Sequence, residues 1–229
     1  MVAAARGDTA ALDALVARRL EGEPLEWLIG HATFLGHRVA LSAGVYVPRP
    51  QTEPIARRAI ELLPPEGTAA DLCTGSGAIA VALRAGRPRA RVVATDIDPA
   101  ACRCAERNGV EVYQGHLTAP LPTDLAGQYD VVVAVAPYVP TEQIAFLPRD
   151  VRRYEPRRAL DGGADGTEVV SQVVRAATGL LRAGGSLLLE LGGDEDRLLA
   201  PVLRAAGFAT VSRFVDDDGD MRGIEAVFG

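Results

Sequence analysis

Short apolar runs alternate with helically spaced apolar positions along most of the chain. The continuous runs predict buried strands, and they lie at residues 68–72, 91–95, 110–113, 130–135 and 186–191. Apolar positions three and four residues apart predict the helices between them, at residues 78–84, from Pro99 onward, at 167–181 and at 194–206. The run at 130–135 is the most continuously apolar, as expected at the centre of a sheet covered on both faces. Two final runs, 208–215 and 221–228, flank an Asp-Gly turn and predict a closing β-hairpin. The alternation predicts an α/β fold, with a doubly wound, mostly parallel sheet and a C-terminal antiparallel hairpin.

The first 50 residues carry weaker patterns and are expected to form a small extension. Apolar positions at residues 9–20 predict an amphipathic helix, capped by Asp8 or Thr9, that lies against the main body. Two short strands are expected around Gly36. After a proline-rich segment, Thr52 is expected to cap the next helix. We therefore divide the chain into an N-terminal helix and β-hairpin extension, residues 1–50, and a main domain, residues 51–229.

A glycine-rich turn, Asp71-Leu72-Cys73-Thr74-Gly75-Ser76-Gly77, joins the first core strand to its helix. Glycines let a ligand approach the backbone closely, and the free N–H groups of the helix start point toward it. The turn also satisfies the pattern G-x-G-x-x-G/A, and Asp96 lies about 20 residues on, as in dinucleotide-binding proteins. An NAD-dependent oxidoreductase is therefore one interpretation, and a plain strand–turn–helix is another.

Three features favour S-adenosylmethionine over NAD. Asp71 precedes the turn, where a carboxylate can serve the cationic amino-acid end of that cofactor, whereas NAD requires a free helix N-terminus for its pyrophosphate. The chain ends in a hairpin instead of a second mononucleotide-binding half. The run at 130–135 leads into Ala136-Pro137-Tyr138-Val139-Pro140, a rigid aromatic loop at the carboxyl end of the sheet. Ligands of α/β proteins bind at that end.

Composition and charge argue against several other classes of protein. The chain of 229 residues is long enough for one α/β domain, and its net charge of −6 argues against strong nucleic-acid binding. No run approaches the roughly 20 apolar residues of a membrane span, and the N-terminus lacks a signal-peptide core, so we expect a cytoplasmic protein without membrane association.

Cys102 and Cys104 are not at a zinc-ligand spacing, and His31 and His37 lack partners at metal spacing, so no metal site is expected. The acidic run at 216–220 is expected to be a solvated turn.

Several motifs together carry a family resemblance. They are Gly22-Glu23-Pro24, Pro48-Arg49-Pro50-Gln51-Thr52-Glu53, the stretch Asp71-Leu72-Cys73-Thr74-Gly75-Ser76-Gly77-Ala78-Ile79-Ala80, Ala136-Pro137-Tyr138-Val139-Pro140, and Glu155-Pro156-Arg157-Arg158-Ala159-Leu160-Asp161-Gly162-Gly163-Ala164-Asp165-Gly166. In these motifs the chain resembles the protein N5-glutamine methyltransferases that modify peptide-chain release factors. These are class I enzymes that depend on S-adenosylmethionine. The resemblance implies S-adenosylmethionine as cofactor and a release-factor-like protein, with a glutamine-containing loop, as substrate.

The resemblance also implies roles for individual residues. The turn from Cys73 to Gly77 would wrap the methionine part of the cofactor, Asp96 would hold the ribose, and His116 and Leu117 would border the adenine. The implied cofactor-binding residues are Asp71, Cys73, Thr74, Gly75, Ser76, Gly77, Asp96, Ile97, His116 and Leu117. The implied substrate-binding residues are Val135, Ala136, Pro137 and Tyr138, with Pro137 and Tyr138 as the catalytic pair.

The acceptor loop departs from the Asn-Pro-Pro-Tyr pattern of the family and reads Val135-Ala136-Pro137-Tyr138. An amide nitrogen is a poor nucleophile, so its methylation depends on orientation: acceptors for the N–H protons and a wall against the planar amide. In the family an Asn side chain and a backbone carbonyl accept, and the aromatic ring is the wall. Val135 has no hydrogen-bonding group, and the loss of one such contact costs about 10²–10³ in rate. His116 also departs, because the family usually has an acidic residue there.

Other interpretations therefore stand beside glutamine methylation. One is a methyltransferase with a changed, unknown small acceptor, and another is a cofactor-binding protein that has lost catalysis. A nucleic-acid adenine methyltransferase would need the same missing Asn and a basic surface. Arg49 and Glu53 either lie near the cofactor or form a salt bridge that stiffens the loop. Tyr154, Arg157 and Arg158 either contact substrate or fix the long loop at residues 136–166.

Overall fold

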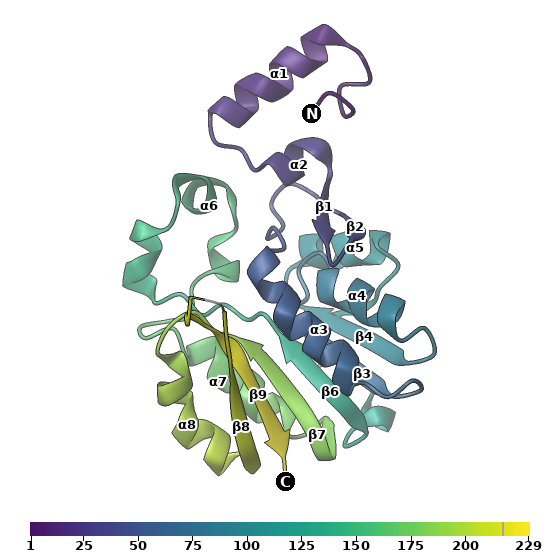
Figure 1. The fold of residues 1–229 in the computed structure, drawn as a ribbon, viewed down its shortest axis with the longest axis vertical. Coiled ribbons are helices and arrows are strands. Elements are labelled where there is room, and N and C mark those ends of the chain that lie inside the picture. Colours follow the sequence, from purple (N-terminus) through teal and green to yellow (C-terminus); the bar gives the residue numbers. More distant parts are fainter. Residues whose placement is uncertain (217) are drawn as a thin grey trace.

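The computed structural model describes residues 1–216 and 218–229 and contains a seven-stranded sheet between two helical layers (Figure 1). Its strands are β3 (Thr68–Leu72), β4 (Arg91–Asp96), β5 (Glu111–Gln114), β6 (Tyr129–Ala134), β7 (Leu181–Glu190), β8 (Phe208–Val215) and β9 (Met221–Phe228). Their order is β5-β4-β3-β6-β7-β9-β8. The first five in this order are parallel, and β9 is antiparallel to both β7 and β8. The predicted fold is confirmed, with β6 at the sheet centre and the closing hairpin at its predicted bounds.

The register of the central strands brings their carboxyl ends to one edge of the sheet. Leu72, the last residue of β3, pairs with Thr95 of β4 and with Ala134 of β6. The segments that follow these three strands therefore begin side by side. The glycine turn, Asp96 at the end of β4 and the Ala136–Pro140 loop, which are far apart in sequence, therefore meet at this edge.

Helices cover both faces of the sheet. On one face lie α3 (Glu53–Leu62), α4 (Ala78–Gly86) and α5 (Pro99–Arg107), and on the other lie α7 (Glu168–Ala177) and α8 (Glu195–Ala205). The first face buries Ile55, Ala59 and Leu83 against Val131 and Val133 of β6. The second face buries Val173 and Leu199 with other apolar residues of these helices against β6 and β7. Removal of this apolar area from water is the main stabilising contribution to the domain.

The N-terminal extension contains α1 (Thr9–Leu20), α2 (Leu25–Ile29) and a hairpin of β1 (His31–Phe34) and β2 (His37–Ala40). The bounds of α1 and its Asp8 cap are confirmed, since the Asp8 side chain accepts the backbone N–H groups of Ala10 and Ala11. The expectation that α1 lies against the main body is wrong. No residue of α1 is buried, and the helix stands away from the sheet beyond α2 (Figure 1). By contrast, the hairpin joins the core through Phe34 and Val39.

Two further elements differ from the sequence expectation. The helix expected over residues 167–181 ends at Ala177, and Leu181 already begins β7, where it pairs with Tyr129 of β6. The error arose because Leu181 continues the helical spacing of apolar residues, although Thr178 and Gly179 break the helix before it. The irregular segment at 136–166 contains the short helix α6 (Arg149–Tyr154) and two 3₁₀ turns, Thr141–Phe146 and Arg157–Ala159.

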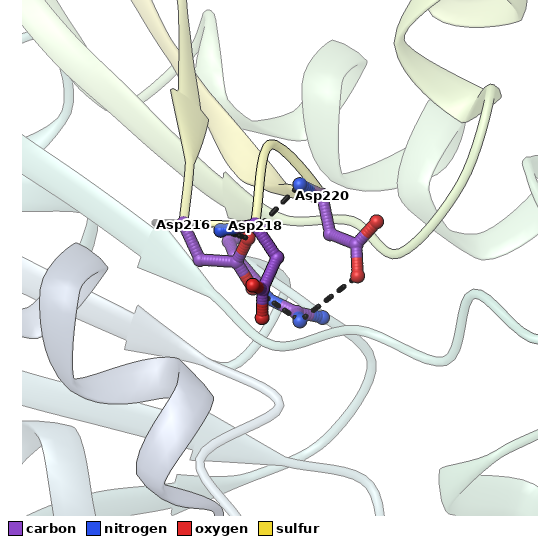
Figure 2. Close-up of polar contacts among 4 residues, drawn as sticks. Asp216, Asp218 and Asp220 are labelled. Atoms are coloured by element: carbon purple, nitrogen blue, oxygen red, sulfur yellow. Dashed lines mark hydrogen bonds and ion pairs between the residues drawn. The ribbon is translucent and has the colours of Figure 1, made fainter.

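The acidic run at the β8–β9 turn is organised by one carboxylate (Figure 2). Asp216 accepts the backbone N–H groups of Asp218 and Asp220, at 3.1 and 2.9 Å, and forms an ion pair with Arg222. Asp220 lies 3.5 Å from the same guanidinium. Asp217, also part of the predicted turn, lies outside the described residues. The carboxylates of Asp216 and Asp220 therefore stabilise this turn.

Residues 1–216 and 218–229 include no helix long and apolar enough to cross a membrane. In the same ranges, no three His, Cys, Asp or Glu side chains gather as metal ligands would. The cysteines Cys73, Cys102 and Cys104 are free thiols, and the last two are buried on α5.

Candidate functional site

A cavity of about 270 Å³ lies at the sheet edge where the central strands end. It collects most of the residues that the sequence singled out. Those lining it are Asp71, Cys73, Thr74, Gly75, Ser76, Asp96, Ile97, His116, Leu117, Val135 and Pro137. Three others do not line it: Gly77 is the N-cap of α4, Ala136 is buried, and Tyr138 lines a different pocket together with Gly192.

The backbone around this cavity adopts unusual conformations. Cys73, Gly75 and Gly77 have φ of +58°, +57° and +82°, so the turn after β3 is left-handed at alternate residues. Gly77 has no substitute, because a Cβ there would lie 2.9 Å from Cγ2 of Val110. Leu117, which also lines the cavity, has a positive φ of +47°. Non-glycine residues in this region cost about 1–3 kcal/mol each and gather at functional sites.

Asp71 is a buried carboxylate at the floor of the cavity, 1% exposed. Its Oδ2 accepts the Thr74 hydroxyl at 2.6 Å and the Ala80 N–H at 3.1 Å. Burial raises the pKa of Asp71 to about 7, although both hydrogen bonds lower it. A cation bound beside this carboxylate would favour its ionised form.

Asp96 is held at the end of β4 by two backbone N–H groups. Gly75 donates to its Oδ2 and Asp98 to its Oδ1, each at 2.8 Å. Burial raises the pKa of Asp96, and these hydrogen bonds oppose the rise. Two buried hydroxyls on the same cavity, Ser76 Oγ and Thr95 Oγ1, have no hydrogen-bond partner among the described residues. Buried polar groups are normally paired, so this wall fits a ligand that carries several polar groups.

Sequence reasoning missed most of the remaining residues that line the cavity; Arg158, a candidate for substrate contact, is the exception. The N-terminal segment contributes Phe34, Gly44, Val45, Tyr46, Pro48 and Thr52, the long loop contributes Pro156, Arg158 and Ala159, and α7 contributes Val169 and Gln172. The proline-rich 48–53 motif was the one signal for the first group. Residues from both sides of the predicted boundary at residue 50 thus line one cavity.

The acceptor loop after β6 is fixed from behind. Val139 N–H donates to Leu160 O at 3.0 Å, and Gly162 N–H donates to Val139 O at 2.9 Å. The Tyr138 hydroxyl donates to Oε1 of the buried Glu190 at 3.1 Å, and both burial and this carboxylate raise the pKa of Tyr138. These contacts restrain the loop next to the cavity, as orientation of a planar acceptor requires.

Thr52 does not cap α3, contrary to the sequence expectation. Its backbone is already helical, with φ −79° and ψ −19°, and its side chain makes no capping hydrogen bond. Its hydroxyl donates instead to Oε2 of Glu190. The buried Glu190 carboxylate at the end of β7 therefore connects Thr52 with Tyr138 of the acceptor loop.

Charged residues of the family-like motifs form loop-stiffening contacts. Arg49 pairs with Glu155, and its guanidinium lies 5.1 Å from the Tyr46 ring centre. Glu53 accepts the Leu35 N–H at 2.9 Å and does not line the cavity. Arg158 does line it and lies 3.8 Å from Asp98.

Comparisons with known proteins agree with this geometry. Residues 69–154 match the family model described as a methyltransferase domain. The chain is 42% identical over 200 residues to a release factor glutamine methyltransferase from Moorella thermoacetica, a match that covers 83% of this chain and 69% of that protein. It is also 40% identical to a 4-amino-L-phenylalanine/4-methylamino-L-phenylalanine methyltransferase from Streptomyces pristinaespiralis, covering 84% and 69%.

A solved structure shares the fold at low sequence identity. The ribosomal protein L11 methylase from Lactobacillus delbrueckii subsp. bulgaricus superposes with a TM-score of 0.57 at 18% identity, over 83% of this chain and 86% of that one. This likeness supports the Rossmann-like arrangement of the sheet.

Proposed function

Because the chain belongs to the release factor glutamine methyltransferase family and is an S-adenosylmethionine-dependent methyltransferase, we propose that it methylates the side-chain nitrogen of a glutamine in a release factor. One observation carries the proposal: the glycine turn, the carboxylates of Asp71 and Asp96 and the Pro137 loop line a single cavity. A release factor as substrate places the reaction in the cytoplasm.

The cofactor fits the residues present, as the glycine turn indicates together with Ser76 Oγ and Thr95 Oγ1, which have no partner among the described residues. Asp71 would face its cationic amino end, the turn from Cys73 to Gly77 its methionine part, and Asp96 its ribose hydroxyls. His116, beside Leu117, would border its adenine. When bound, it supplies a methyl group on a sulfonium, an electrophile that needs no further activation.

The acceptor loop orients the amide. Pro137 lines the cavity, and Tyr138 is held behind it by Glu190, so the planar amide would lie against a fixed wall. In the family a backbone carbonyl at the Ala136 position accepts an amide N–H; here Ala136 is buried and does not line the cavity, and Val135 offers no side-chain acceptor. Because orientation supplies most of the rate in such a transfer, a rigid wall is the main contribution of this loop.

Methyl transfer from labelled S-adenosylmethionine to a purified release factor tests the proposal. We expect label in the factor, and none when its target glutamine is replaced by alanine. Binding of the cofactor without transfer to any acceptor would instead support a protein that has lost catalysis.

A second acceptor class is favoured by a specific feature. Val135, Phe34 and Pro48 make the acceptor side of the cavity apolar, and one relative of 40% identity is named for methylation of an aryl amine. An aryl amine keeps a more available lone pair than an amide and needs fewer N–H acceptors. Transfer to 4-aminophenylalanine faster than to the release factor would favour this acceptor.

A further inference from the structure

A buried carboxylate lies immediately behind the acceptor side of the cavity. Glu190, the last residue of β7, is 2% exposed. Its Oε2 accepts the hydroxyl of Thr52, and its Oε1 accepts the hydroxyl of Tyr138 at 3.1 Å. Among the described residues it has no ion-pair partner within 4.0 Å. Both carboxylate oxygens are thus hydrogen-bonded to neutral hydroxyls. The Glu190 carboxylate can therefore accept a proton.

The Thr52 hydroxyl donates a hydrogen bond to Glu190 and does not cap α3. A threonine that caps a helix N-terminus contributes about 1 kcal/mol, and Thr52 stands at that position of α3 without making the bond. A hydroxyl has one proton and two lone pairs. Because the proton points to Glu190, the lone pairs remain to accept a hydrogen bond from the cavity, which Thr52 lines together with Val135.

We propose that the Thr52 hydroxyl, held by Glu190, accepts an N–H of the acceptor amide and thereby provides the contact that Val135 lacks. This inference rests on the proposed function and assigns Thr52 as a residue that binds the acceptor amide. Thr52 would touch the substrate, and Glu190 would act through Thr52.

Thr52 and Glu190 together take up the proton that the amide nitrogen loses during methylation. As the bond between nitrogen and methyl forms, the bond between sulfur and methyl breaks, and its electron pair stays on sulfur. The nitrogen then gives one proton to Thr52 Oγ1 while the Thr52 proton moves to Glu190 Oε2. Glu190 ends protonated and the other groups end neutral. Burial raises the pKa of Glu190, which makes its carboxylate a better proton acceptor than an exposed one.

Steady-state kinetics on the release factor compare Thr52→Val, Thr52→Ser and Glu190→Gln with the unaltered chain. We expect Thr52→Val and Glu190→Gln to lower kcat by about 10²–10³, the cost of one transition-state contact. Cofactor Kd, measured by calorimetry, should stay within about twofold. Thr52→Ser keeps the hydroxyl and should retain most of kcat, a rescue that a purely structural role of the methyl group would not give.

A matched control is Thr167→Val, which removes a hydroxyl bonded to Asp165 at another helix start and outside the cavity. It should leave kcat unchanged. Adding Val135→Asn to Thr52→Val should restore activity, because the amide of Asn supplies the missing acceptor. A fully active Thr52→Val variant would overturn the inference alone. Absence of transfer by the unaltered chain would overturn the proposed function, and the inference with it.

Discussion

At the edge of the sheet, the carboxylates of Asp71 and Asp96 lie at the ends of β3 and β4, while the apolar Val135 follows β6. Asp71 is buried and Asp96 is partly buried, and desolvation raises the pKa of each. The register places Leu72 opposite Ala134, so the apolar Val135 begins directly beside this charged half. The cavity therefore has one side suited to a polar, cationic ligand and another that orients its partner through shape.

The raised pKa of Asp71 makes a pH-dependent prediction for Asp71→Asn. Between the ordinary carboxyl value and about 7, the folded chain holds a proton that the unfolded chain has released. Stability from this group is therefore greatest at low pH and is lost as pH rises through that window. Asn cannot ionise, so without cofactor Asp71→Asn should be stabilised relative to the native chain more at about pH 8 than at about pH 5.

Calorimetric melting at the two pH values, with no cofactor present, measures this difference. The same variant should bind S-adenosylmethionine more weakly at the higher pH, because the cation loses its carboxylate. A stability difference that is independent of pH would contradict the account of Asp71.

Individual site residues were predictable only where local spacing carries the chemistry. Asp71, Gly75 and Asp96 lie in the strand–turn–helix pattern, which requires those residue types. Thr52 was interpreted as a helix cap because a threonine before a helix usually is one. Its true partner, Glu190, is 138 residues away in sequence, and no local pattern reports such a contact.

Among the elements, the strands were predicted better than the segments between them. Continuous apolar runs identified β3, β4 and β6, because both faces of these strands are buried. The five-residue α2 was missed because it is too short to show a helical period. The walls formed by residues 44–52 and 156–159 depend on tertiary packing, so sequence alone could not assign them to the cavity.

Gly192, two residues after β7, lies against the Tyr138 ring, and Gly192→Ala tests this contact. A Cβ at Gly192 would lie 2.9 Å from Cε2 of Tyr138, closer than atoms pack, so the ring must move. Because this ring lies behind Pro137, its displacement would shift the cavity wall, and a shift of about 1 Å costs up to about 10²-fold in rate. We expect kcat to fall by about tenfold or more while cofactor Kd is kept.

Steady-state rates and calorimetric titration check this expectation. Gly179→Ala is the control, since its Cβ would lie 3.7 Å from the nearest atom, Ala176 O. Equal rates for the two variants would show that Tyr138 tolerates displacement.

At the scale of the whole molecule, α1 contributes little to the packed body. None of its residues is buried, and Leu20 is 82% exposed. Removal of residues 1–20 should therefore shift Tm by no more than about 3 °C, since about 1 kcal/mol corresponds to 2–4 °C in a domain of this size. A much larger loss in a thermal melt would mean that α1 stabilises the fold.

The central claim is that this cavity methylates glutamine even though Val135 stands in the acceptor loop. Tandem mass spectrometry of a release factor incubated with the chain and S-adenosylmethionine tests it most directly. We predict one added methyl group, located on the side-chain nitrogen of a single glutamine. An unmodified factor, under conditions where calorimetry shows the cofactor bound, would contradict the claim.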